Sequence, residues 1–188
     1  MQKLNTLSLA HYFIESHIVP GDLCIDATAG RGYDTAFLAK LVGETGKVIA
    51  FDIQQEALDS TASLLREQGL DRNVTLYRDS HANMERYADA GTVSCITFNF
   101  GYLPGGDHHI CTHAESSIAA IEAGLRLLKD NGIMSLCIYY GGDSGFDEKN
   151  ALIDYLKTID NHKYTVLITE FANRPNNPPI PVFIYKRI

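Results

Sequence analysis

Long apolar segments are absent from this sequence of 188 residues. No stretch approaches the roughly 20 consecutive apolar residues that a membrane-crossing helix needs. The N-terminal segment MQKLNTLSLAHYFIESH is interrupted by Lys3, His11 and Glu15, so we expect no signal peptide and a cytoplasmic protein without a membrane partner. The hydrophobic content of 45% is enough for one well-buried core, and we expect residues 1–188 to form a single domain.

Paired cysteines are also missing. The four cysteines, Cys24, Cys95, Cys111 and Cys137, lie far apart, and no C-x-x-C pair occurs. Three of them lie in apolar runs, which is typical of buried, reduced residues. The segment HHICTH at 108–113 collects three histidines and one cysteine, but their spacing is too short to surround one tetrahedral ion. We therefore predict no metal site and regard this segment as a polar loop.

An excess of basic residues is the third absence. The chain has a formal net charge of −7 and a pI near 5.4. Proteins that bind nucleic acid without sequence preference use Lys and Arg to neutralise phosphates. The charge therefore argues against non-specific binding, and an RNA substrate would require a local basic patch.

The apolar positions alternate between helical and strand patterns along the chain. An N-terminal helix is expected within residues 1–20, with its apolar stripe at 5–19. Seven strands are predicted, at 23–27, 47–52, 73–79, 92–100, 133–140, 163–171 and 181–188. Further helices are predicted at 33–42, 55–68, 81–88, 112–129 and 146–159. Five βα units followed by a hairpin indicate an α/β fold with a doubly wound, seven-stranded sheet whose last strand is antiparallel.

Polar residues follow each of the first four predicted strands, where the apolar pattern ends. These exits are the segment 26–32, Asp52, Asp79 and Asn99. Ligands of doubly wound sheets bind beyond the carboxyl ends of the strands, at the point where the strand order reverses. We therefore expect the four exits to converge on one ligand site.

The first exit, DATAGRGYDT, places Gly30 and Gly32 where a strand passes into a helix. Glycine permits a sharp turn and lets a ligand approach the backbone. A dinucleotide normally requires a third glycine, in G-x-G-x-x-G, and here Thr35 occupies that position. The missing glycine counts against NAD, whereas Asp52 would suit the ribose of a dinucleotide or of S-adenosylmethionine.

Two of these exits resemble motifs of class I S-adenosylmethionine-dependent methyltransferases. Asp26-x-Thr28-x-Gly30-x-Gly32 resembles their motif I, and NFGY at 99–102 resembles their NPPY-type signature for amine methylation. The strings DATAGRGYDT, FDIQ, DSH and NFGYLPGGDH, in this order, resemble a bacterial rRNA methylase family over most of the chain, and GYLPGGD is the most specific of them. That family includes enzymes that methylate 5-aminomethyl-2-thiouridine at the tRNA wobble position to 5-methylaminomethyl-2-thiouridine.

The resemblance implies S-adenosyl-L-methionine as the cofactor and the anticodon region of tRNA as the substrate. A homodimer would assemble the composite basic surface that a small acidic domain needs to bind RNA. The residues expected to bind the cofactor are Asp26, Thr28, Gly30, Arg31, Gly32, Asp34, Thr35, Asp52, Ile53, Gln54, Asp79, Ser80, His81 and Asn99.

The catalytic residues expected from this resemblance are Asn99, Tyr102 and Asp107. The side-chain carbonyl of Asn99, with the backbone carbonyl of Phe100, would accept hydrogen bonds from an amine and aim its lone pair at the methyl group. Tyr102 would stack on the uracil ring or donate its hydroxyl. The candidates for receiving the amine proton are Asp107, His108 and His113.

Each assignment also has a purely structural alternative. Asp26, Asp52 and the segment 79–81 contain residue types that cap helices, and Asn99 could anchor a turn. The Arg174–Pro181 loop either touches a nucleotide or only connects two strands. The alternative functions are a methyltransferase for rRNA or a small amine, and a nucleotide-binding protein without turnover.

Overall fold

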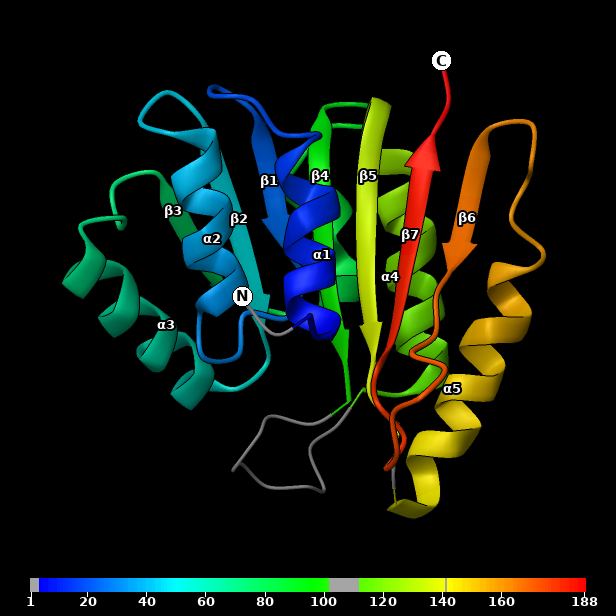
Figure 1. The fold of residues 1–188 in the computed structure, drawn as a ribbon. Helices are drawn as coiled ribbons and strands as arrows, with labels where there is room; N and C mark the ends of the chain where they lie inside the picture. Colours follow the sequence, from blue (N-terminus) through cyan, green and yellow to red (C-terminus); the bar gives the residue numbers. More distant parts are fainter. Residues whose placement is uncertain (1–3, 102–111, 141) are drawn as a thin grey trace.

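The computed structural model describes residues 4–101, 112–140 and 142–188, with the side chains of 142–144 excepted. One sheet with helices on both faces makes up the fold (Figure 1). Its strands are β1 (Leu23–Asp26), β2 (Lys47–Asp52), β3 (Val74–Arg78), β4 (Val93–Phe100), β5 (Leu128–Ile138), β6 (Tyr164–Ile168) and β7 (Ile180–Lys186). The helices are α1 (Thr6–Glu15), α2 (Tyr33–Val42), α3 (Gln55–Gln68), the short 3₁₀ helix η1 (His81–Arg86), α4 (Ala114–Leu127) and α5 (Gly142–Leu156).

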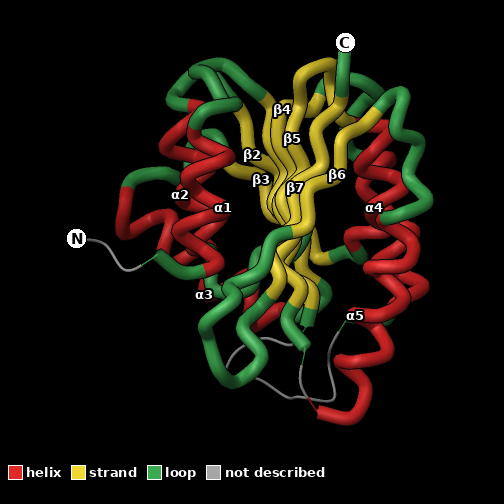
Figure 2. Tube along the Cα trace, turned by 45° about the vertical axis from the view of Figure 1, so that its right-hand side comes forward, coloured by secondary structure: helices red, strands yellow, loops and turns green. Residues whose placement is uncertain are grey.

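The strand order is β3-β2-β1-β4-β5-β7-β6. Strands β1 to β5 pair in parallel, and β7 runs antiparallel to both of its neighbours, β5 and β6. Figure 2 shows α1, α2 and α3 on one face of the sheet and α4 and α5 on the other. The prediction of a doubly wound, seven-stranded α/β sheet with an antiparallel last strand is confirmed.

Neighbouring positions of the central strands point to opposite faces of the sheet, and both faces are buried. Cys24 is aligned with Val48 and Cys95, and these three belong to the cluster that packs under α1 and α2. Ile25 belongs to the cluster under α4. Because both faces are covered, the parallel strands are continuous apolar runs, as the sequence pattern requires. Cys24, Cys95 and Cys137 are buried and free, and burial raises the pKa of Cys24 to about 12.

The start of β5 differs from the prediction. The segment Asp130-Asn131-Gly132 was expected to end the preceding helix, and the strand to begin at residue 133, but β5 begins at Leu128. Asn131 has a φ of 61°, and the pairing of β4 with β5 shifts its register between Val93 and Cys95. The polar segment therefore forms a bulge inside the strand and not a connection before it.

Two of the helices show the clearest differences from the prediction, one in its type and one in its position. The helix expected at 81–88 is a 3₁₀ helix over His81–Arg86, and the one expected at 146–159 spans Gly142–Leu156. Within the described residues, none of the helices combines the length and the apolar character needed to cross a membrane.

Candidate active site

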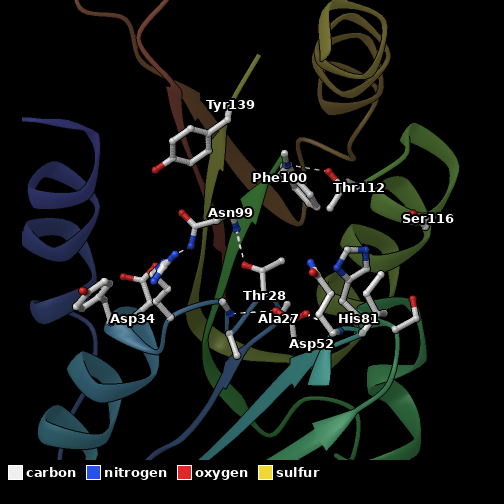
Figure 3. A pocket seen from close by; sticks show the side chains of 18 of the residues that line it. Ala27, Thr28, Asp34, Asp52, His81, Asn99, Phe100, Thr112, Ser116 and Tyr139 are labelled. Atoms are coloured by element: carbon white, nitrogen blue, oxygen red, sulfur yellow. Dashed lines mark hydrogen bonds between the residues drawn. The ribbon is translucent and has the colours of Figure 1, made fainter. Parts of the chain in front are cut away.

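A cavity of about 400 Å³ opens at the carboxyl ends of β1, β2 and β4, beside the strand-order reversal between β1 and β4 (Figure 3). The volume lies within the range of known small-molecule sites. Thr28, Asp52, Asp79 and Asn99 all line this cavity, so the four predicted exits do converge. The predicted cofactor residues found in its wall are Thr28, Gly30, Arg31, Asp34, Asp52, Ile53, Gln54, Asp79, Ser80, His81 and Asn99.

Three residues expected to bind the cofactor, Asp26, Gly32 and Thr35, are not among the residues that line the cavity. Asp26 and Thr35 are fully buried, and the Thr35 hydroxyl donates to Asp26 Oδ2 at 2.6 Å. Gly32 has a φ of 84°, and a Cβ at this position would lie 2.9 Å from the Cα of Thr61. Gly32 therefore permits close packing of the turn on α3, while Asp26 supports the turn from below.

Asp26 carries an unusual charge environment. Burial, followed by the neighbouring Asp34 carboxylate, raises the pKa of Asp26 to about 7. The hydrogen bonds from Thr35 and from the backbone N–H of Thr28 act in the opposite direction but are weaker.

Asp52 joins the first two strand exits. Its Oδ2 accepts the backbone N–H of Gly30 at 3.0 Å, and its Oδ1 accepts that of Gln54 at 2.9 Å. The carboxylate therefore fixes the glycine turn and also lines the cavity. A structural role and a ligand-binding role are compatible at this position.

Asp79 is held by three donors at the third exit. The Asn83 amide, the Tyr87 hydroxyl and the backbone N–H of Ser80 each donate to its carboxylate at 2.7 Å. The hydrogen bonds from Asn83 and Tyr87 lower the pKa of Asp79. Ser80 caps η1 by accepting the backbone N–H of Ala82 at 3.3 Å. This exit also combines capping with a place in the cavity wall.

The His81 side chain forms an uncharged part of the wall. Its ring lies 6.0 Å, centroid to centroid, from both Phe98 and Phe100. Burial lowers the pKa of His81 to about 4, so the imidazole is neutral at pH 7. This histidine adds no positive charge to the cavity.

Asn99, near the end of β4, is held through both its backbone and its side chain. Its backbone N–H donates to Thr28 Oγ1 at 2.7 Å, and its side-chain Nδ2 donates to Asp34 Oδ2 at 2.7 Å. Figure 3 shows both bonds as dashed lines, with the amide oxygen turned away from Asp34. Within the described part of the chain this oxygen has no donor.

The backbone carbonyl of Phe100, expected to help orient an amine, is already paired. It accepts the backbone N–H of Tyr139 at 2.9 Å. Tyr139 itself lines the cavity, and burial raises the pKa of its hydroxyl to about 12, so the phenol stays protonated. Tyr139 directly follows β5, which ends at Ile138, whereas the sequence pattern placed it inside a strand at 133–140, so the strand-exit rule did not point to it.

The start of α4 adds residues that the sequence reasoning missed. Thr112 and Ser116 line the cavity, as does His113, which was expected only as a proton acceptor. The Thr112 hydroxyl accepts the backbone N–H of Gly101 at 2.8 Å and donates to the buried Glu148 at 2.9 Å. Thr112 and Ser116 do not directly follow a strand, so the pattern of polar strand exits does not point to them.

The remaining predicted residues are of two kinds. Tyr102, Asp107 and His108 are outside the described residues. The Arg174–Pro181 loop does not contribute to the cavity wall, and the described part of the chain contains no cluster of three potential metal ligands. Arg174 instead lies 3.9 Å over the ring of Phe171 and donates to the carbonyl of Leu4.

The cavity suits a ligand that carries a positive charge and hydrogen-bond donors. Three carboxylates, those of Asp34, Asp52 and Asp79, belong to its wall. The backbone at Gly30 has a φ of 53° and lies open to the cavity. A sulfonium with a ribose and an amino group, as in S-adenosylmethionine, has the matching chemistry.

Known proteins match both the sequence and the fold. A family described as "Putative rRNA methylase" matches residues 48–185, and one described as Protein-L-isoaspartate(D-aspartate) O-methyltransferase matches residues 4–90. The chloroplastic tRNA (mnm(5)s(2)U34)-methyltransferase of Arabidopsis thaliana is 35% identical, over 95% of this chain and 68% of that protein.

Two solved structures are similar over nearly the whole chain. A "putative rRNA-methylase" from Clostridium thermocellum is 45% identical with a TM-score of 0.95, covering 99% of this chain and 100% of that one. A "putative methyltransferase" from Streptococcus mutans, solved in complex with SAH, is 33% identical with a TM-score of 0.88, covering 99% of both chains. The chain therefore belongs to the rRNA methylase family and is an S-adenosylmethionine-dependent methyltransferase.

Proposed function

We propose that the protein methylates the primary amine of 5-aminomethyl-2-thiouridine at the wobble position of tRNA, giving 5-methylaminomethyl-2-thiouridine. The observation that carries the proposal is the orientation of Asn99, whose amide nitrogen is bound to Asp34 and whose oxygen is left to accept an N–H. The name of the Arabidopsis relative, a tRNA (mnm(5)s(2)U34)-methyltransferase, supports the same acceptor here.

The cofactor would be held along the exits of β1, β2 and β3. We assign its ribose hydroxyls to Asp52, its adenine to the Asp79–His81 segment, and its amino-acid part to the turn at Thr28 to Arg31. When bound, the cofactor supplies an electrophilic methyl group on a sulfonium. Asp26, Gly32 and Thr35 would act indirectly, by shaping the turn.

The acceptor amine must be neutral before it can attack. An alkyl amine resembles lysine, with a pKa of roughly 10 in water, so it arrives mostly protonated. His113, Asp107 and His108 stay our candidates for receiving that proton, and of these His113 lines the described cavity.

Besides removing the proton, the protein must position the acceptor nitrogen relative to the methyl group. Displacement at a methyl carbon is in line, so the acceptor nitrogen needs a fixed distance and direction but no covalent help from the protein. One N–H of the amine would donate to Asn99 Oδ1, which turns the nitrogen lone pair toward the methyl group. We infer that Tyr139, across the cavity from Asp52 in Figure 3, lies on the acceptor side.

One assay tests this function. The protein is incubated with methyl-labelled cofactor and tRNA that bears or lacks the 5-aminomethyl group, and the labelled nucleoside is identified after digestion. We expect label only in 5-methylaminomethyl-2-thiouridine. Because the family description names rRNA, ribosomal RNA and small alkyl amines are parallel substrates. Label in either of these, with none in tRNA, would contradict the proposal.

We also propose that the protein binds tRNA as a homodimer, since a chain with a net charge of −7 needs a composite surface to hold RNA. Sedimentation of the protein with and without tRNA measures this directly. If tRNA is bound by the monomer as tightly as by the dimer, the homodimer proposal is contradicted.

A further inference from the structure

We propose that Asp34, supported by His11, is a positioning residue for methyl transfer, because it fixes the side-chain amide of Asn99 with its oxygen toward the acceptor. This role rests on the proposed function only in requiring that the acceptor carry an N–H. It differs from the direct cofactor contact that the sequence led us to expect for Asp34.

Three elements far apart in the sequence meet at this carboxylate. Asn99 Nδ2, from β4, donates to Asp34 Oδ2 at 2.7 Å. His11 Nε2, from α1, lies 2.7 Å from Asp34 Oδ1. Asp34 stands in the first turn of α2 and is only 12% exposed, so both of its oxygens are used in a largely buried place.

The carboxylate decides how the amide is turned. The nitrogen and oxygen of an asparagine amide can be exchanged by a flip, and the hydrogen-bond network must settle which is which. A carboxylate only accepts hydrogen bonds, so it must face the amide nitrogen of Asn99 and the protonated Nε2 of His11. The amide oxygen of Asn99 is then left for a donor in the cavity.

The same bond also strengthens the oxygen as an acceptor. A hydrogen bond from N–H to a carboxylate is charge-assisted and short, as the 2.7 Å distance shows. Donation from the nitrogen shifts electron density in the amide toward its oxygen, because hydrogen bonds in a chain polarise one another. With the backbone of Asn99 bound to Thr28, the amide has one orientation that satisfies all its partners.

His11 keeps the carboxylate in place. Its ring is stacked on Phe37 of α2, with 3.7 Å between centroids and 5° between planes. The helix that carries it is held by the buried residues Ala10 and Ile14. His11 therefore occupies the Asp34 oxygen that would otherwise be open to water or to a ligand, and this gives α1 a part in the active site.

Kinetics separate positioning from binding. In Asp34→Ala we expect kcat to fall by about 10- to 100-fold, while KM for tRNA and Kd for S-adenosylmethionine change less than about threefold. The Asp34→Asn side chain keeps one oxygen to accept from Asn99, and its N–H can donate to His11 Nε2 when the histidine hydrogen is on Nδ1. This variant should therefore recover most of the kcat that Asp34→Ala loses. His11→Ala should lower kcat by about 3- to 10-fold, and His11→Gln, which can still donate, should restore it.

Two control variants test whether these changes in kcat are specific to Asp34 and His11. Tyr12→Ala changes an exposed residue on the same helix as His11, and Asp59→Ala removes an exposed carboxylate from α3. Neither should change kcat. A large rise in Kd for the cofactor in Asp34→Ala, with kcat unchanged, would make Asp34 a cofactor ligand and overturn the positioning role.

Nuclear magnetic resonance tests the amide without any substrate. In protein labelled with ¹⁵N-asparagine, one side-chain proton of Asn99, assigned by its loss in Asn99→Ala, should resonate downfield of those of exposed asparagines. In Asp34→Ala this resonance should return to the range of the exposed asparagines. In Asp34→Asn it should move part of the way toward that range, and this variant provides the test if Asp34→Ala does not fold. An unchanged resonance in both variants overturns the proposal. If the resonance is downfield but the wild-type protein transfers no methyl group to tRNA, the positioning role of Asp34 is supported and the proposed tRNA substrate is contradicted.

Discussion

The two sides of the cavity are built differently. The side assigned to the cofactor consists of short continuous turns, at Thr28 to Arg31, Asp52 to Gln54 and Asp79 to His81, each directly after a strand. The opposite side in Figure 3 collects residues from distant parts of the chain, namely Asn99, Thr112, Ser116 and Tyr139. Substitutions on the first side should therefore change cofactor affinity, and those on the second side should change turnover.

The largest expected effect is a loss of kcat from a substitution on the side opposite the cofactor turns. Asn99→Ala removes the acceptor oxygen, so we expect kcat to fall by about 100-fold or more with little change in cofactor Kd. Single-turnover kinetics and calorimetric titration measure the two quantities. Asn150→Ala, at an exposed position of α5, is the control. If Asn99→Ala lowers only the affinity for the cofactor and leaves kcat unchanged, the proposed separation of cofactor binding and turnover between the two sides is wrong.

The opposite pattern is expected for Asp52→Ala. This change removes the assigned ribose partner and frees the backbone N–H groups of Gly30 and Gln54. Kd for S-adenosylmethionine should rise by about 10- to 100-fold, while kcat at saturating cofactor stays within a few-fold. Titration of the wild type with NAD is a further check, and stronger binding of NAD than of S-adenosylmethionine would contradict the assignment of this side.

The difference between the sides also explains what the sequence could predict. A turn that follows a parallel strand must lie at the carboxyl edge of the sheet, so Gly30, Asp52 and Asp79 were placed correctly from local pattern alone. The contact of His11 with Asp34 depends on how α1 packs against α2, and no local pattern contains it. Ser116 was missed for a related reason, because it lies within a helix.

Where local pattern failed, tertiary packing decided the outcome. Asp26 begins a motif typical of a ligand turn, yet the turn carries its side chain beneath the sheet edge, where it binds Thr35. The polar residues before residue 133 look like a helix stop, but pairing with β4 draws them into β5 as a bulge around Asn131. In both cases the residue type was interpreted correctly and its surroundings were not.

Gly32 tests the packing behind the cofactor side. Gly32→Ala combines a φ of 84° with a contact of 2.9 Å to the Thr61 backbone, whereas Gly69→Ala has a φ of 68° and open space. Both variants share the conformational penalty, and we expect Gly32→Ala to destabilise the protein by about 2 kcal/mol more. Chemical denaturation measures both, and equal losses would show that close packing at Gly32 is unimportant.

The smallest expected effect concerns the charge of Asp26 beneath the same turn. Burial raises its pKa to about 7, so the folded state holds this proton more tightly than the unfolded state does. Its contribution to stability is complete below the unfolded pKa of about 4 and is lost as the pH rises through 7. Asp26→Asn cannot titrate, so it should gain on the order of 1 kcal/mol relative to the wild type between pH 5 and pH 6. Urea denaturation at several pH values gives this difference, with the exposed Asp59→Asn as control. A difference that does not change with pH would mean that the carboxylate stays ionised in its buried place.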